Sequence, residues 1–326
     1  MSAPRVLAIA DRPGWAIDRK ALNLQRVLAG RYDITVRYQR EVTPADLDAA
    51  DLVMVFYWLE TLQMEQLPPG ALAACTDRLV MGVCSHFELD GEQREPGVAM
   101  LNSLPRAVFV NSRLLEDKCR PLLTAPLHYT PNGVDTAFFT PAPRPREQAV
   151  GELRVGWAGS LGNMGAAQRG FHDVIEPAIA AVPGAVLHTA IREQQWRTAA
   201  EMVEWYRELD VYVCASVDEG TPNPCLEAAA CGISIVTTRV GNMPELIVDG
   251  VNGHFHEGTV ASLAERLTGL RDSPSLTAQL GARLRADIIE WDWARQAERY
   301  ATMFDDVLGG SRAPRTRPWW RPRRRR

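Results

Sequence analysis

Residues 211–238 read VYVCASVDEGTPNPCLEAAACGISIVTT, in which two β-branched runs enclose a polar loop and an Ala-rich stretch. The β-branched runs predict short strands, and the Ala-rich stretch predicts a helix that begins near Pro224 and ends at Gly232. Strands that alternate with helices along a chain form parallel sheets that helices cover. This stretch therefore predicts an α/β fold.

The same alternation extends over the whole chain and predicts two domains of similar size. Helical stretches are expected at 260–273 and 275–308. We expect two Rossmann-like, doubly wound domains that face an interdomain cleft, with ligands beyond the carboxyl ends of the strands. Short β-branched runs predict strands at residues 5–11, 32–38, 51–58, 77–84, 107–112, 126–132, 153–160, 185–191, 211–216 and 233–238.

Composition suggests where the domains begin and end. The stretch TPAPRPREQAVGE is rich in proline and charge and has nothing to bury, which predicts a linker between the domains. Two glycines, Gly309 and Gly310, are expected to end the last helix. The segments are a first domain, the linker, a second domain, a C-terminal helix and a tail, at residues 1–139, 140–152, 153–286, 287–308 and 309–326.

Composition also excludes several classes of protein. The chain has 326 residues, of which 46% are hydrophobic and 23% charged, as in a soluble globular protein and unlike a disordered or fibrous one. No window approaches about 18 uninterrupted apolar residues, which argues against a transmembrane helix. The six cysteines include no Cys-x-x-Cys pair, which argues against a structural zinc site. Residues 1–15 lack the features of a secretion signal, so we expect a cytoplasmic protein.

The net charge of −4 hides an acidic body and a basic tail. The last fifteen residues, RAPRTRPWWRPRRRR, contain eight arginines, and without them 28 basic and 40 acidic residues leave a charge of −12. Proline and like charge predict a disordered, solvated tail. Its functional interpretation is contact with an anionic membrane at the inner face, with Trp319 and Trp320 at the interface, and nucleic acid is a weaker alternative.

The loop between the two strands of 211–238 contains the densest group of polar residues. Glu219 and Glu227 lie eight residues apart, on either side of a Gly-Thr-Pro-Asn-Pro turn. A helix that begins near Pro224 would direct free backbone N–H groups at a phosphate, and Glu227 would lie in its first turn. By spacing alone, the two acids are equally compatible with surface positions at a helix start.

A longer stretch of sequence favours the functional interpretation, because residues 216–255 resemble the nucleotide-sugar-binding signature of retaining glycosyltransferases of family four (glycosyl transferases group 1). These enzymes have the GT-B fold, and their mark is two glutamates separated by seven residues. The resemblance extends to VFVNSRLLEDK, TPNGVDTAFFTP, WAGS and GFHDVIEPAI, which begin at residues 108, 130, 157 and 170. It covers the second domain closely and the first domain loosely.

The resemblance implies roles for the residues of this loop. Glu227 would bind the ribose hydroxyls of a nucleoside-diphosphate sugar, and Glu219 would contact the transferred sugar or support charge near its anomeric carbon. Pro222 removes a backbone donor, so side chains must supply more of the contacts. The remaining donor-binding positions implied for sugar hydroxyls and phosphate oxygens are Gly220, Thr221, Asn223 and Pro224.

The diphosphate of such a donor needs cations, and here the sequence departs from the family. Family members present an arginine just after the first strand of the second domain, where this chain has Ser160, directly after Gly159. Arg169 stands where a lysine is expected, and Arg192 is the second candidate; a solvated surface position is the alternative for Arg169. The glycine-rich loop could still let its backbone approach a phosphate.

In the first domain, polar residues follow several predicted strands and are candidates for the acceptor side. Gly14 allows close approach at a helix start, and Trp15 offers an apolar face to a sugar ring. The resemblance places His86 close to the reacting sugar, as a catalytic or acceptor-side residue, although a structural histidine fits equally well. Asn111, with Ser112, is interpreted first as a helix cap and second as an acceptor contact.

The aromatic residues of the C-terminal helix favour a packing role over a partner-binding surface. Trp291, Trp293, Tyr300 and Phe304 are spaced by two, seven and four residues. In the family, this helix crosses back onto the first domain, so the resemblance implies that these side chains pack there.

The resemblance implies a retaining transfer in which the leaving phosphate takes the acceptor proton, so no general base is named. It also implies no tightly bound cofactor or metal, with the nucleotide sugar as co-substrate. The glycines from residue 159 onward do not have dinucleotide-fingerprint spacing, which argues against a nicotinamide enzyme. Two alternatives stay open: a GT-B-fold epimerase or phosphorylase, and a non-catalytic nucleotide-sugar-binding protein. The acceptor, whether glycan, glycolipid or natural product, is not defined.

Overall fold

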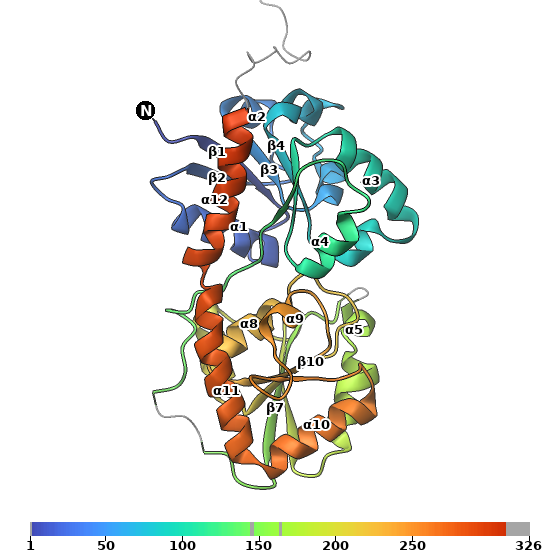
Figure 1. The fold of residues 1–326 in the computed structure, drawn as a ribbon, viewed down its shortest axis with the longest axis vertical. Helices are drawn as coiled ribbons and strands as arrows, with labels where there is room; N and C mark the ends of the chain where they lie inside the picture. The colour runs from blue at the N-terminus through green and yellow to red at the C-terminus, as the bar shows by residue number, and fades with distance from the viewer. Residues whose placement is uncertain (1, 144–146, 163–164, 311–326) are drawn as a thin grey trace, which may run out of the picture. The chain divides into compact units, whose positions relative to one another are not determined.

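The computed structural model describes residues 2–143, 147–162 and 165–310 (Figure 1). The chain divides into two compact units: residues 1–132 with 293–326, and residues 133–292. The expected cleft between the two sheets stays a prediction. The tail at 311–326, with its expected disorder and membrane contact, lies outside the described residues.

In its described part, the first unit contains a six-stranded sheet with the order β2-β1-β3-β4-β5-β6. All neighbouring strands are parallel. The β-branched and apolar side chains of the central strands are buried on both faces, as expected of a parallel sheet covered by helices. The strands are β1 (Arg5–Ala10), β2 (Asp33–Tyr38), β3 (Leu52–Val55), β4 (Leu79–Val83), β5 (Ala107–Val110) and β6 (Leu127–Tyr129).

Helices cover both faces of this sheet. Helices α1 (Ala16–Val27) and α12 (Trp293–Gly310) share one apolar cluster with the strands, and Trp293, Tyr300 and Phe304 are buried in it. The predicted packing role of these three aromatic residues is therefore confirmed. The other helical segments are α2 (Pro44–Ala49), η1 (Trp58–Gln63), η2 (Ala71–Arg78), η3 (His86–Leu89), η4 (Gly91–Gln93), α3 (Arg94–Ser103) and α4 (Arg113–Cys119).

The second unit contains a five-stranded parallel sheet with the order β11-β10-β9-β7-β8 among its described residues. One core cluster joins the sheet to α7, α8 and α11, and another joins it to η5, α6 and α10. Its elements are β7 (Leu153–Gly159), α5 (Gly165–Gln168), η5 (Phe171–Ile175), α6 (Glu176–Ala180), β8 (Ala185–Ile191), α7 (Ala199–Arg207), β9 (Val211–Cys214), α8 (Asn223–Ala230), β10 (Ser234–Thr237), α9 (Met243–Leu246), β11 (His254–Phe255), α10 (Val260–Asp272), α11 (Pro274–Ile288) and η6 (Ile289–Trp291).

The prediction of two Rossmann-like α/β domains is confirmed, and each of the ten predicted strands is present. The helical stretch expected at 275–308 is instead broken between α11 and α12. At the break, the Asp292 carboxylate accepts hydrogen bonds from the backbone and hydroxyl of Thr136, at 3.0 and 2.6 Å. Gly309 and Gly310, expected to end the last helix, are the last two residues of α12 and of the described part of the chain.

In each sheet, the first strand along the chain lies between the next two: β1 lies between β2 and β3, and β7 lies between β8 and β9. This arrangement creates a topological switch point. In the second unit this point lies between β7 and β9. Ligands of doubly wound sheets bind at such a point, beyond the carboxyl ends of the strands. Within the described residues, no helix has both the length and the apolar character needed to cross a membrane.

Candidate functional site

The loop after β9 carries Glu219 and is held by hydrogen bonds from neighbouring segments. Ser216 Oγ donates to Glu219 Oε1 at 3.1 Å, and Thr238 Oγ1 donates to the Ser216 carbonyl at 2.6 Å. Gly241, with φ +53°, lies so close that a Cβ there would be 2.7 Å from the Gly220 carbonyl oxygen. Only glycine allows this approach, so the loop after β10 fixes the Glu219 loop.

The Glu219 carboxyl lies next to one cationic side chain. Its Oε1 is 3.7 Å from Arg169 Nε, and 22% of the Glu219 side chain is exposed. Burial raises the pKa of Glu219 to about 7, although the charge of Arg169 opposes the rise. A carboxyl with so high a pKa at a strand end is a candidate for a functional group.

This raised pKa predicts a pH-dependent stability. The folded protein holds the Glu219 proton more tightly than the unfolded chain does, so the free energy of unfolding should fall as the pH rises through this range. Glu219→Gln removes the effect and should stabilise the protein by on the order of 2 kcal/mol near pH 8.5 and by about zero near pH 4.5. Urea unfolding at both pH values measures the difference. The exposed Glu208 provides a control, Glu208→Gln, and a Glu219→Gln gain that is independent of pH would contradict the shift.

Glu227 lies on α8, which begins at Asn223, so it occupies the second turn and not the first as predicted. Pro222 has non-helical backbone angles, so the helix begins directly after it, one residue before Pro224. Tyr206, from α7, donates its buried hydroxyl to Glu227 Oε2 at 2.8 Å. This contact orients the carboxylate on the helix surface.

Two buried polar side chains near Glu219 have no hydrogen-bond partner among the described residues. Thr221 is 8% exposed and its Oγ1 is unpartnered. Asn242, which sequence reasoning missed, is completely buried and neither side-chain polar atom is bonded. Buried polar groups are nearly always bonded, so these atoms are suited to a ligand or water. Asn223 donates its backbone N–H to the Thr221 carbonyl at 2.9 Å, and Pro224 follows it in α8.

The glycine-rich loop after β7 was expected to offer its backbone N–H groups to a phosphate, but these groups already have a partner. Its backbone donors, Leu161 N and Gly162 N, each lie 3.1 Å from a carboxylate oxygen of Glu193, and Ser160 Oγ donates to the same carboxylate. Arg169 Nη1 donates to the Ser160 carbonyl at 2.7 Å. The structure therefore brings Ser160, Arg169 and Glu219 together, but with an acidic side chain in the loop.

The contact of Glu193 with the loop after β7 was not predicted from the sequence, although the strand register indicates it. Strands β7 and β8 are parallel neighbours, and Gly159 pairs with Ile191 in their register. Residues that follow the two strands must then lie side by side. Arg192, the second candidate cation, stacks its guanidinium 4.4 Å from the centre of the Trp196 ring.

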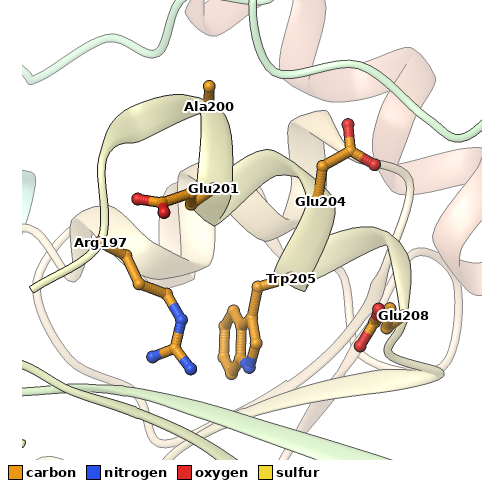
Figure 2. A pocket seen from close by; sticks show the side chains of 6 residues that line it. All are labelled: Arg197, Ala200, Glu201, Glu204, Trp205 and Glu208. Atoms are coloured by element: carbon orange, nitrogen blue, oxygen red, sulfur yellow. The ribbon is translucent and has the colours of Figure 1, made fainter. Parts of the chain in front are cut away.

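A hollow elsewhere in the second unit contains none of the predicted site residues. It has a volume of about 460 Å³ and lies along α7, where Figure 2 shows Arg197 beside Trp205. Two of its three acids have partners, because Glu201 caps the helix at Thr198 and Glu204 pairs with Arg207 at 2.6 Å. These contacts explain the acidic lining as helix capping and surface pairing.

The four candidate acceptor-side residues all follow strands of the first unit's sheet. Gly14, with φ +74°, donates its N–H at 2.7 Å to the carboxylate of Asp18, which lies in the first turn of α1. The Arg12 guanidinium lies 4.3 Å from the centre of the Trp15 ring and covers one face of it. Trp15 can therefore offer only its other face to a sugar.

The remaining two residues lie at the ends of neighbouring strands, β4 and β5. His86 begins η3 and is partly exposed, and its carbonyl accepts a hydrogen bond from Lys118 at 2.7 Å. Asn111 is 4% exposed and donates to the Cys84 carbonyl at 3.4 Å. The cap of α4 is Ser112, whose hydroxyl accepts from Leu115 N at 3.3 Å, so Asn111 does not cap the helix.

Residues 171–273 match the family described as Glycosyl transferases group 1. The match begins after β7 and includes both Glu219 and Glu227.

A curated relative and two solved structures extend this comparison. The D-inositol 3-phosphate glycosyltransferase of Arthrobacter sp. is 28% identical over 218 residues, which are 56% of this chain and 52% of the relative. The chain thus spans about half the length of that relative. Sucrose-phosphate synthase from Thermosynechococcus elongatus has a TM-score of 0.73 at 15% identity and covers 95% of this chain and 100% of its own. Anabaena HepE, solved with UDP and glucose, has a TM-score of 0.69 at 16% identity, over 92% and 98%. At such identities, the two structures establish the fold alone.

Proposed function

We propose that the protein is a glycosyltransferase that moves a sugar from a nucleoside-diphosphate sugar to an acceptor. The observation that carries this proposal is the placement of Glu219 beside Arg169 at the switch point of the second sheet, with Glu219 inside the segment 171–273 that matches the glycosyltransferase family. Ligands of doubly wound sheets bind at such a point.

In this proposal the loop between Glu219 and Glu227 holds the donor. Glu227, oriented by Tyr206, accepts hydrogen bonds from the ribose hydroxyls, and Glu219 contacts the transferred sugar. The unpartnered Thr221 hydroxyl supplies a further polar contact. Arg169 supplies positive charge for the diphosphate as the sugar leaves, which lowers the energy of the transition state.

The finer features of the reaction follow from the resemblance described above. We propose that transfer retains the configuration at the anomeric carbon, and that the donor binds without a tightly held metal ion. His86 and Trp15, at the carboxyl edge of the first sheet, belong to the acceptor side in this proposal. The relative's name gives one acceptor class to try first, a sugar or cyclitol phosphate.

The experiment that tests the proposal is a donor panel. The purified chain is incubated with UDP-, GDP- and ADP-sugars, with and without inositol phosphate, and release of nucleoside diphosphate and the anomeric proton signal of the product are followed. We expect release from one donor class, and a product with the donor's anomeric configuration. Nucleotide binding without release from any donor would favour the non-catalytic binding protein instead.

We also propose that the tail at 311–326 contacts an anionic membrane surface. Eight arginines with Trp319 and Trp320 provide the charge and the interfacial aromatic residues for such contact. Truncation after Gly310 should reduce sedimentation with phosphatidylglycerol liposomes and leave transfer to a soluble acceptor unchanged. Equal sedimentation of the truncated and full chains would reject the membrane contact.

A further inference from the structure

Glu193 is an acidic side chain surrounded by hydrogen-bond donors at the carboxyl end of β7. Ser160 Oγ and Gly162 N donate to Oε1, the latter at 3.1 Å, and Leu161 N donates to Oε2 at 3.1 Å. A Cβ at Gly162 would be 3.0 Å from Glu193 Oε1, so the glycine leaves room for the carboxylate. Three donors that converge on one anionic group constitute an anion site.

The carboxylate in this site is ionised and is held by neutral groups. The hydrogen bond from Ser160, with those from the backbone, lowers the pKa of Glu193 to about 2. Among the described residues, Glu193 has no ion-pair partner, and its side chain is exposed. The side chain can therefore leave the donors for water without opening a cavity or breaking an ion pair.

The same donors lie where a diphosphate is needed by the proposed reaction. Arg169 lies between these donors and Glu219. Its guanidinium donates to the Ser160 carbonyl at 2.7 Å, and its Nε lies 3.7 Å from Glu219 Oε1. A carboxylate and a phosphate cannot share these donors, since both need the same N–H groups and like charges repel at short range.

We propose that Glu193 is a built-in competitor of the donor diphosphate. Its carboxylate occupies the donors of Ser160, Leu161 and Gly162 in the free protein and leaves them when a diphosphate binds. This inference rests on the proposed function. Glu193 would hold the loop in an anion-binding conformation in the free protein. Its competition with the diphosphate would also lower the affinity for the sugar donor.

The test measures diphosphate binding to the full chain by isothermal titration calorimetry. The probes are UDP, GDP, ADP and inorganic pyrophosphate, and the variants are Glu193→Ala and Glu193→Gln, with Glu208→Gln as an exposed control of the same charge change. Glu193→Ala should bind the preferred diphosphate and pyrophosphate about tenfold more tightly, since the hydrogen bonds to the carboxylate no longer need to be broken. Glu193→Gln should show a smaller gain, and Glu208→Gln no gain.

Other outcomes separate this inference from the proposed function. If the unaltered chain binds a nucleoside diphosphate and both Glu193 variants, folded by circular dichroism, bind it equally or less tightly, Glu193 supports the loop and the inference fails alone. The same holds if binding requires Mg²⁺ and is lost in Glu193→Gln, because the carboxylate would then hold a cation. Pyrophosphate binding by Glu193→Ala, with no nucleotide bound by any variant, would uphold the competitor and reject the proposed donor. Absence of all binding would reject both.

Discussion

Replacing Glu219 by glutamine is expected to lower the rate constant for sugar transfer by about 100-fold or more. Its carboxyl is fixed by Ser216 and lies 3.7 Å from Arg169 at the switch point of the second sheet. In the proposed reaction it interacts with the transferred sugar as charge develops at the anomeric carbon, and a neutral amide cannot match that interaction. The decrease should appear in kcat, measured by release of nucleoside diphosphate at saturating donor.

Replacing Glu227 by glutamine should affect KM, in contrast to the effect of Glu219→Gln on kcat. Its proposed partners are the ribose hydroxyls, which are bound equally before and during transfer, so Glu227→Gln should raise the KM for the donor and leave kcat nearly unchanged. We expect the KM for the donor to rise about 10-fold, because the hydrogen bonds to a charged acceptor are lost. Transfer by Glu219→Gln at the unaltered rate, or a loss confined to KM, would show that Glu219 does not act on the transferred sugar.

Gly281→Ala is expected to destabilise the protein by about 2 to 4 kcal/mol, the largest effect on stability that we predict. Gly281 lies in α11, where a Cβ would be 2.3 Å from the Gly232 carbonyl oxygen. That oxygen belongs to the backbone and cannot move aside as a side chain would. The turn at Gly232 ends α8, which carries Glu227, so displacement of α11 should also disturb the donor loop.

A matched variant separates packing from helix propensity. Gly269 lies in α10 with no atom within 4 Å of a Cβ built on it, among the described residues. Gly269→Ala should therefore stabilise the protein by about 0.5 to 1 kcal/mol, because alanine favours a helix over glycine. Thermal and urea unfolding of both variants measure the difference. Equal effects of the two substitutions would contradict the close packing of α11 against Gly232.

The sheets could be predicted from the sequence because each buried strand of a parallel sheet is a short apolar run. The break between α11 and α12 was missed, although the spacing of the buried apolar residues changes there from four to five, between Ile288 and Trp293. Its cause is a contact from residues far away in the chain, where Thr136 bonds Asp292. The two-residue β11 has no hydrophobic period of its own and depends on its pairing with β10.

The candidate site was partly predictable for similar reasons. The spacing of Glu219 and Glu227 is a local property of one loop and helix, whereas their partners, Arg169 and Tyr206, come from other segments. The occupation of the loop after β7 by Glu193 depends on the register of two strands. Asn242 also escaped notice, since nothing in its neighbours indicates complete burial without a partner.

The most direct test of the proposed donor site is a crystal structure of the full chain with a nucleoside diphosphate. The nucleotide to use is the one that raises the melting temperature most in a thermal-shift assay. We expect the ribose within hydrogen-bond distance of Glu227, and the diphosphate between Arg169 and the loop at 160–162, with the Glu193 carboxylate displaced. A nucleotide bound elsewhere, such as in the hollow along α7, or failure of every nucleoside diphosphate to bind, would contradict the proposed donor site.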